Sequence, residues 1–193
     1  MLASITPLGE RGRGFSWGLT ASAFAAGAIA AGALAGAVAG ALGSLLPGGV
    51  WRSVAALVVL TAAVSFDATP LRRRLPSTRR QVNEDWMARY RGWVYGVAFG
   101  AQLGTGLTTV VTSAAIYAAA LGAVLCGTVA SGLAVGAALG ATRALSLLPA
   151  RGVRDGPGLV GLHRRLAGLE SPVRWLVVAA EAVAIGAVIG GLV

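Results

Sequence analysis

The sequence predicts an all-α, polytopic membrane protein: a bundle of five transmembrane helices, with six as the alternative. Apolar residues make up 56% of the 193 residues and charged residues only 12%, whereas a soluble domain carries about a quarter charged residues. Five apolar stretches are long enough to cross a hydrocarbon core, for which about 20 helical residues suffice. They cover residues 15–46, 50–66, 93–117, 121–148 and 173–193.

The arginines orient these helices. All 16 basic residues are arginine: two precede the first stretch, seven lie between the second and third, and five lie between the fourth and fifth or at the start of the fifth. Arg52 is the exception at an opposite loop, so the positive-inside rule places the N-terminus in the cytoplasm. The composition is typical of a bacterial genome and indicates a bacterial cytoplasmic membrane. The expected partner is the lipid bilayer, and no nucleic acid is needed to explain the basic charge.

A short motif occurs twice and predicts an internal two-helix repeat. Residues 13–18 read RGFSWG and residues 91–96 read RGWVYG. This offset of 78 residues defines units 13–80 and 91–158, followed by the final span 173–193. Chance alignment of alanine- and glycine-rich sequence is the alternative.

The first apolar stretch is longer than a membrane is thick. Its 32 residues would extend about 48 Å as one helix, so it must tilt, project into water or break. Within the second unit a break costs least at Gly104 and Gly106, because glycine is a poor helix former. Interrupted helices are common in transporters, and a long tilted helix is the alternative.

Three of the stretches carry glycines at every fourth position, which is typical of close helix packing. Such faces can bind this chain's own helices, a second copy or other membrane proteins. The glycines are Gly32, Gly36 and Gly40 in the first stretch, Gly92, Gly96, Gly100 and Gly104 in the third, and Gly132, Gly136 and Gly140 in the fourth.

Polar residues follow one face of the third stretch at helical spacing, which favours a substrate path along this helix. The alternative is that the hydroxyl groups bond carbonyls of their own helix. The residues are Gln102, Thr105, Thr108, Thr109, Thr112, Ser113 and Tyr117.

Two charged residues lie inside the predicted spans and away from the first residues of these spans: Glu181 in the fifth and Arg143 in the fourth. A bare carboxylate inside a membrane costs at least about 2.5 kcal/mol, so Glu181 should be paired, protonated or hydrated. An ion pair between Glu181 and Arg143 is the simplest account. Proton or cation coupling by Glu181 and extension of its side chain to the membrane surface are the alternatives.

The segment 77–91 between the second and third spans is basic and amphipathic. We expect a helix that starts at Ser77 and lies on anionic headgroups. His163 should be solvated in a cytoplasmic loop, and the lone Cys126 should be a small packing residue. No catalytic, metal or cofactor motif is apparent in the sequence.

Residues 95–113, YGVAFGAQLGTGLTTVVTS, resemble the DsbD/CcdA-type membrane bundle family, without its cysteines. Members of that family are compact bundles of two repeats with a glycine-rich, often broken leading helix. The resemblance implies a compact bundle with a transport function, but no thiol chemistry.

Together these features favour a small transporter or channel-like protein with its path along the third span. The competing hypothesis is a non-catalytic scaffold or assembly subunit that packs through its glycine faces. An enzyme is less favoured because no nucleophile–base or metal constellation is visible.

Overall fold

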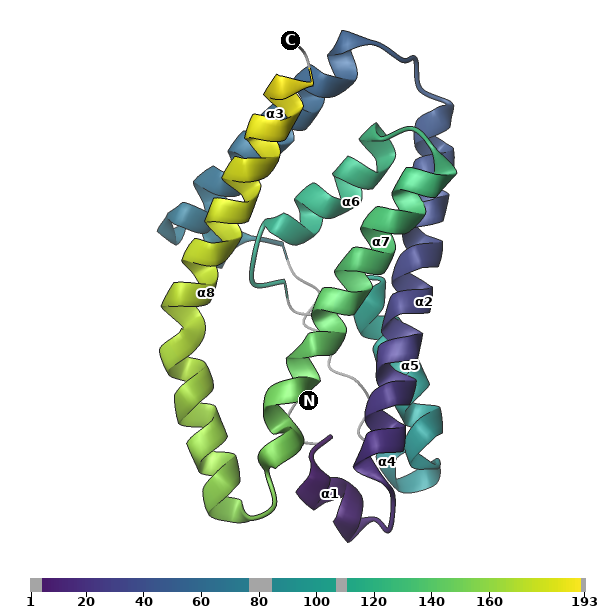
Figure 1. Cartoon of the computed structure of the whole chain (residues 1–193), viewed down its shortest axis with the longest axis vertical. Helices are drawn as coiled ribbons and strands as arrows, with labels where there is room; N and C mark the ends of the chain where they lie inside the picture. The colour runs from purple at the N-terminus through teal and green to yellow at the C-terminus, as the bar shows by residue number, and fades with distance from the viewer. Residues whose placement is uncertain (1–4, 77–84, 107–110, 192–193) are drawn as a thin grey trace. The chain divides into compact units, whose positions relative to one another are not determined.

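The computed structural model describes residues 5–76, 85–106 and 111–191, and all regular structure within them is helical. The all-α class is therefore confirmed. In chain order the elements are α1 (Pro7–Gly12), α2 (Trp17–Ser44), α3 (Val50–Ala68), η1 (Pro70–Arg74), α4 (Asp85–Arg89), α5 (Gly92–Gly104), α6 (Ala115–Leu125), α7 (Val129–Ala144), η2 (Leu145–Gly152) and α8 (Gly156–Gly190) (Figure 1).

Four helical segments of the described residues are long and apolar enough to cross a membrane: α2, α3, α7 with η2, and α8. They correspond to the first, second, fourth and fifth predicted spans. Helix α2 continues unbroken over 28 residues, or about 42 Å. The long-helix alternative is therefore correct for the first stretch.

The third predicted span is not one helix. The prediction of a continuous helix over residues 93–117 was therefore wrong. Helix α5 ends at Gly104, Gly106 takes a φ of 72°, and α6 begins only at Ala115. Positive φ is accessible to glycine at little cost. The interruption thus starts at the glycines where the sequence indicated that a break costs least.

The later span boundaries also move. Gly127, with a φ of 63°, separates α6 from α7 inside the predicted fourth span. Helix α8 begins at Gly156, well before the predicted start at residue 173, and has 35 residues. At about 52 Å it exceeds the hydrocarbon thickness of about 30 Å. Part of α8 must therefore project from a bilayer or tilt strongly.

The chain forms two compact units. Unit 1 comprises residues 1–32, 79–109 and 137–169, and unit 2 comprises residues 33–78, 110–136 and 170–193. Helices α2, α7 and α8 each contribute residues to both units.

In unit 1, α5 runs parallel to the first half of α2. A Cβ atom on Gly96, Gly100 or Gly104 would collide with backbone carbonyls that follow one another along α2, those of Thr20, Phe24 and Ala28. The backbones therefore touch without intervening side chains. The apolar core of this unit contains Ile5, Phe24, Tyr95, Phe99 and Leu147.

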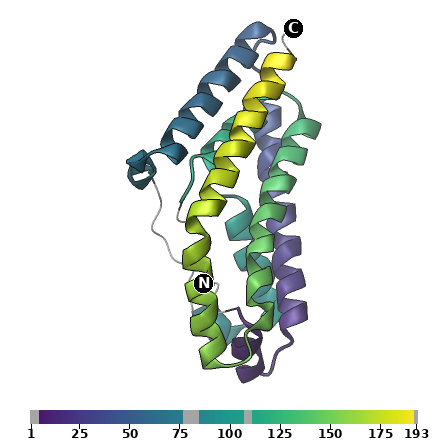
Figure 2. The ribbon, with the colours of Figure 1, turned by 60° about the vertical axis from the view of Figure 1, so that its left-hand side comes forward.

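In unit 2, the second half of α2 packs antiparallel to α7. Cβ atoms on Gly36 and Gly40 would collide with the carbonyl oxygens of Gly132 and Thr128. Helix α6 packs antiparallel to α3 through a small core of Ala63, Ala114 and Ala118. The C-terminal half of α8 lies beside α3 (Figure 2).

Candidate functional site

The start of α6 is held by a buried carboxylate of α3. Asp67 is 2% exposed. It accepts hydrogen bonds from Ser113 Oγ at 2.5 Å and from the Ala114 amide at 2.8 Å. A helix N-terminus exposes unsatisfied N–H groups and a positive dipole end. Asp67 satisfies both, so α6 can begin inside an apolar unit.

Sequence reasoning missed Asp67 because of a small boundary error. The predicted second span ended at Phe66, which assigned Asp67 to a loop, whereas α3 extends to Ala68. An aspartate directly after an apolar stretch was the available signal.

The end of α5, in unit 1, is held by a cation. Arg143 Nη1 donates a hydrogen bond of 2.9 Å to the carbonyl of Leu103, in the last turn of α5. A positive group at a helix C-terminus satisfies an unpaired carbonyl and matches the negative end of the dipole. Both ends of the interruption are therefore bound by charged side chains from candidate spans.

Arg52, the exception in the arginine distribution, has a similar structural role in unit 2. Its guanidinium donates hydrogen bonds of 2.6–2.9 Å to carbonyls at the end of α2, those of Gly43, Leu46 and Pro47. Gly127 lies directly against this guanidinium, so that a Cβ atom would collide with it. Arg52 therefore caps α2 and contacts the turn between α6 and α7.

Glu181 differs from these three charged residues. It is 5% exposed, and neither carboxylate oxygen has a hydrogen-bonding partner among the described residues. Asp67 interacts with it electrostatically. Among the described residues, the oxygens of Glu181 have no hydrogen-bonding partner, so the contacts give no support to the expected ion pair with Arg143.

The predicted polar stripe does not lie on one helix. Gln102 belongs to α5 in unit 1 and Tyr117 to α6 in unit 2, because the glycine break ends the regular helical spacing. Thr105 Oγ1 donates to the carbonyl of Gln102, as the alternative for these hydroxyl groups proposed. Thr112 is exposed before α6. Thr108 and Thr109 lie outside the described residues.

The remaining glycines of the predicted faces also lie on helices. Gly32 is buried in α2, and Gly92 is buried at the start of α5. The backbone of Gly136 approaches Gly36, and a Cβ atom on Gly140 would collide with the carbonyl of Ala28.

A second buried constellation surrounds Glu10 in unit 1. Glu10 is 0% exposed. Its Oε1 accepts hydrogen bonds from Arg13 Nη2 at 2.6 Å and Tyr95 OH at 2.5 Å, and its Oε2 accepts one from Thr20 Oγ1 at 2.7 Å. This network ties α1 to α2 and α5. Sequence reasoning missed it because the basic residues near Glu10 were interpreted only as topology signals.

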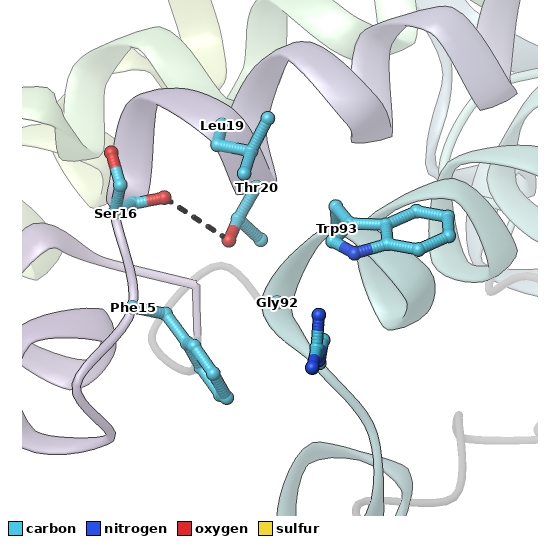
Figure 3. Close-up of a pocket in the computed structure, with 7 residues that line it drawn as sticks. Phe15, Ser16, Leu19, Thr20, Gly92 and Trp93 are labelled. Carbon is cyan, nitrogen blue, oxygen red and sulfur yellow. Dashed lines mark hydrogen bonds between the residues drawn. The ribbon is translucent and has the colours of Figure 1, made fainter.

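A pocket of about 380 Å³ lies beside this network. Figure 3 shows Phe15 and Thr20 near the start of α2 opposite Gly92 and Trp93 at the start of α5. The two copies of the Arg-Gly-aromatic motif thus both contribute to this pocket. Its remaining lining residues are Ser16, Leu19 and Arg91.

Several minor predictions need correction. His163 is exposed but lies on α8 and not in a loop. Cys126 is exposed and lines a pocket of unit 2, so it is not a buried packing residue. Of segment 77–91, residues 77–84, including the expected cap Ser77, lie outside the described residues. The described part contains only the short helix α4.

Comparisons with protein-family models, curated proteins and solved structures found no match. Within residues 5–76, 85–106 and 111–191, no group of three or more His, Cys, Asp and Glu side chains could hold a metal ion.

Proposed function

We propose that the protein is a small transporter of the bacterial cytoplasmic membrane whose path passes the interruption between α5 and α6. The observation that carries this proposal is the pair of charged caps: Arg143 on the end of α5 and Asp67 on the start of α6. Non-helical backbone at membrane depth is tolerated only where protein buries it or water reaches it. Interrupted helices are a recurrent feature of solute sites in transporters.

The scaffold alternative rested on glycine faces that could bind other proteins. In each unit these faces contact helices of the same chain, as at Gly100 against Phe24 and Gly36 against Gly132. A face already in contact with its own chain is not available to a partner. This occupancy favours transport over a scaffold that uses the glycine faces.

The helix directions support five crossings in this proposal. Helix α5 runs parallel to α2 within unit 1, and α6 runs antiparallel to α3 within unit 2. In this proposal α3 returns across the membrane after α2, so the third crossing runs in the direction of α2. We therefore count α5 and α6 as one interrupted crossing, which places the C-terminus outside.

Water access at the interruption tests this proposal without knowledge of the substrate. In a Cys126→Ala background, Thr112→Cys should react rapidly with a charged methanethiosulfonate reagent. Val183→Cys, at a position 72% exposed on the apolar helix α8, should react slowly because a thiolate in lipid is strongly disfavoured. Similar slow rates at both positions would count against a hydrated path.

A permeation assay then separates a hydrated pocket from a path. Vesicles of phosphatidylethanolamine and phosphatidylglycerol that contain the protein are exposed to osmotic steps of amino acids, sugars, polyols and salts, and their volume is followed by light scattering. At least one solute class should enter faster than into empty vesicles, and modification of Thr112→Cys should remove the difference. Permeation equal to that of empty vesicles, for every solute, would contradict transport.

Two glycines, one before α3 and one at the start of α8, allow a test of the orientation. A Cβ atom on Gly48 or Gly156 would meet no other atom within 4 Å, so cysteine should be tolerated at either position. The test uses intact cells that express the protein with Cys126 replaced by alanine. An impermeant maleimide should label Gly48→Cys from outside, while Gly156→Cys should be labelled only after the membrane is opened. The arginine asymmetry motivates this expectation, and the opposite pattern would invert the topology.

A further inference from the structure

The charged residues within the apolar stretches of the candidate spans include two arginines and an aspartate that have a structural explanation. Arg52 and Arg143 bind carbonyls at helix ends, and Asp67 binds the start of α6. Glu181 accepts no hydrogen bond from the residues that the structure describes, although it is only 5% exposed. A buried carboxylate with no partner stabilises no fold, because the cost of its desolvation is not offset.

From this contrast we infer that Glu181 is the proton-binding residue of the proposed transporter, and that it works beside the permanently engaged carboxylate of Asp67. The inference deepens the proposed function and rests on it. Glu181 takes a proton from hydronium, so that one O–H bond of hydronium breaks, the O–H bond of the neutral carboxylic acid forms, and a water molecule is left. The reverse step returns the proton to water when the site is hydrated.

The geometry assigns different tasks to the two acids. Both oxygens of Asp67 accept hydrogen bonds, from Ser113 and from the Ala114 amide, so Asp67 needs no proton to satisfy them. Glu181 belongs to the same unit, interacts electrostatically with Asp67, and has no hydrogen-bond donor among the described residues. Two like charges in one apolar unit repel each other. A proton on Glu181 removes this repulsion, and loss of the proton restores it. The net charge of unit 2 therefore changes by one each time Glu181 binds or releases a proton.

A proton fits this site better than a metal cation. Hard cations require several oxygen ligands at once, whereas both oxygens of Asp67 already accept hydrogen bonds. A proton needs only one carboxylate oxygen.

The carbodiimide DCCD tests the site directly, because this apolar reagent reacts with protonated carboxyl groups. Purified full-length protein in detergent is treated over a series of pH values, and the modified residues are located by mass spectrometry. We expect Glu181 to be modified at low pH and progressively less as the pH rises. Glu170 lies on the same helix but is exposed and ion-paired with Arg72, so it should remain unmodified and serves as an internal control.

Two variants make the test specific. Glu181→Gln should abolish the modification. Asp67→Asn keeps an oxygen acceptor for the Ala114 amide but removes the neighbouring charge, so the pH dependence of the Glu181 labelling should change. An unchanged midpoint would contradict the role of Asp67, and the absence of modification at any pH would overturn the inference. If Na⁺ protects Glu181 from modification at constant pH, the site binds a metal cation, and the assignment of a proton is overturned.

The labelling and permeation results are independent of each other. If DCCD modifies Glu181 but no solute permeates, the proposed transport fails while the proton site stands. For a solute that does permeate, a pH gradient across the vesicle membrane should drive its accumulation. Glu181→Gln should lose this accumulation and retain passive permeation, and accumulation that survives the substitution would refute coupling through Glu181.

Discussion

Replacement of Gly100 by alanine is expected to prevent stable folding, although it adds one methyl group. The new Cβ atom would collide with the carbonyl oxygen and carbon of Phe24 and would also meet the Ala28 amide. These are backbone atoms of a helix and cannot rotate away, so α5 and α2 would have to separate. Overpacking typically costs about 1–3 kcal/mol, and a backbone obstacle places Gly100→Ala at or above the top of that range. Thermal unfolding in detergent, followed by size-exclusion chromatography, measures the loss.

Gly186 provides a matched control on another candidate span. It is exposed in α8, and a Cβ atom there would meet no other atom within 4 Å. Gly186→Ala should therefore leave the unfolding temperature unchanged or raise it slightly, because alanine is favoured over glycine in helices by about 1 kcal/mol. Equal stability of the two variants would show that the close approach of α5 to α2 is incorrect.

Replacement of Glu10 by alanine should be the most damaging change among the charged residues at the N-terminal end. It removes the acceptor of the Tyr95 and Thr20 hydroxyl groups and the carboxylate that binds Arg13. Removal of one partner from a buried ion pair costs about 3–5 kcal/mol, so unit 1 should unfold at a markedly lower temperature. Near-ultraviolet circular dichroism, which reports on the packing of Tyr95, should weaken at the same time.

Two controls separate the buried network from a general effect of charge. Glu10→Gln keeps oxygen and nitrogen atoms in place but loses the charge, so its stability should fall between those of the parent and Glu10→Ala. Glu170→Ala breaks an ion pair of similar length, 2.8 Å to Arg72, but the side chain of Glu170 is 65% exposed. Exposed pairs contribute little to stability, and this variant should unfold close to the parent. Equal losses for Glu10→Ala and Glu170→Ala would reject the network.

The predicted internal repeat agrees with the structure at the repeated motif but not in the helices that follow it. The two copies of the Arg-Gly-aromatic motif lie near the starts of α2 and α5, and both contribute to one pocket. The helices that follow differ, however: α2 is continuous over 28 residues, whereas α5 has 13 and is followed by an interruption. The internal repeat therefore remains a prediction.

The sequence by itself determined the class of the protein and the places of its long helices. Hydrocarbon is a uniform solvent, so the length and composition of an apolar stretch suffice to predict a membrane span. It also indicated Gly104 and Gly106 as the cheapest place for a break, because helix propensity is a local property.

Only the tertiary structure decided which polar groups meet. Asp67 binds Ser113 and Glu10 binds Tyr95, although 46 and 85 residues separate the partners in the sequence. An aspartate or a glutamate can cap a helix, form an ion pair or remain without a partner. Which of these occurs depends on the distant atoms that lie within hydrogen-bonding distance. Sequence reasoning therefore noticed Glu181 but expected Arg143 beside it, and it overlooked Asp67 entirely. A hydrogen bond requires a specific partner in a specific direction, and the folded chain alone supplies that partner.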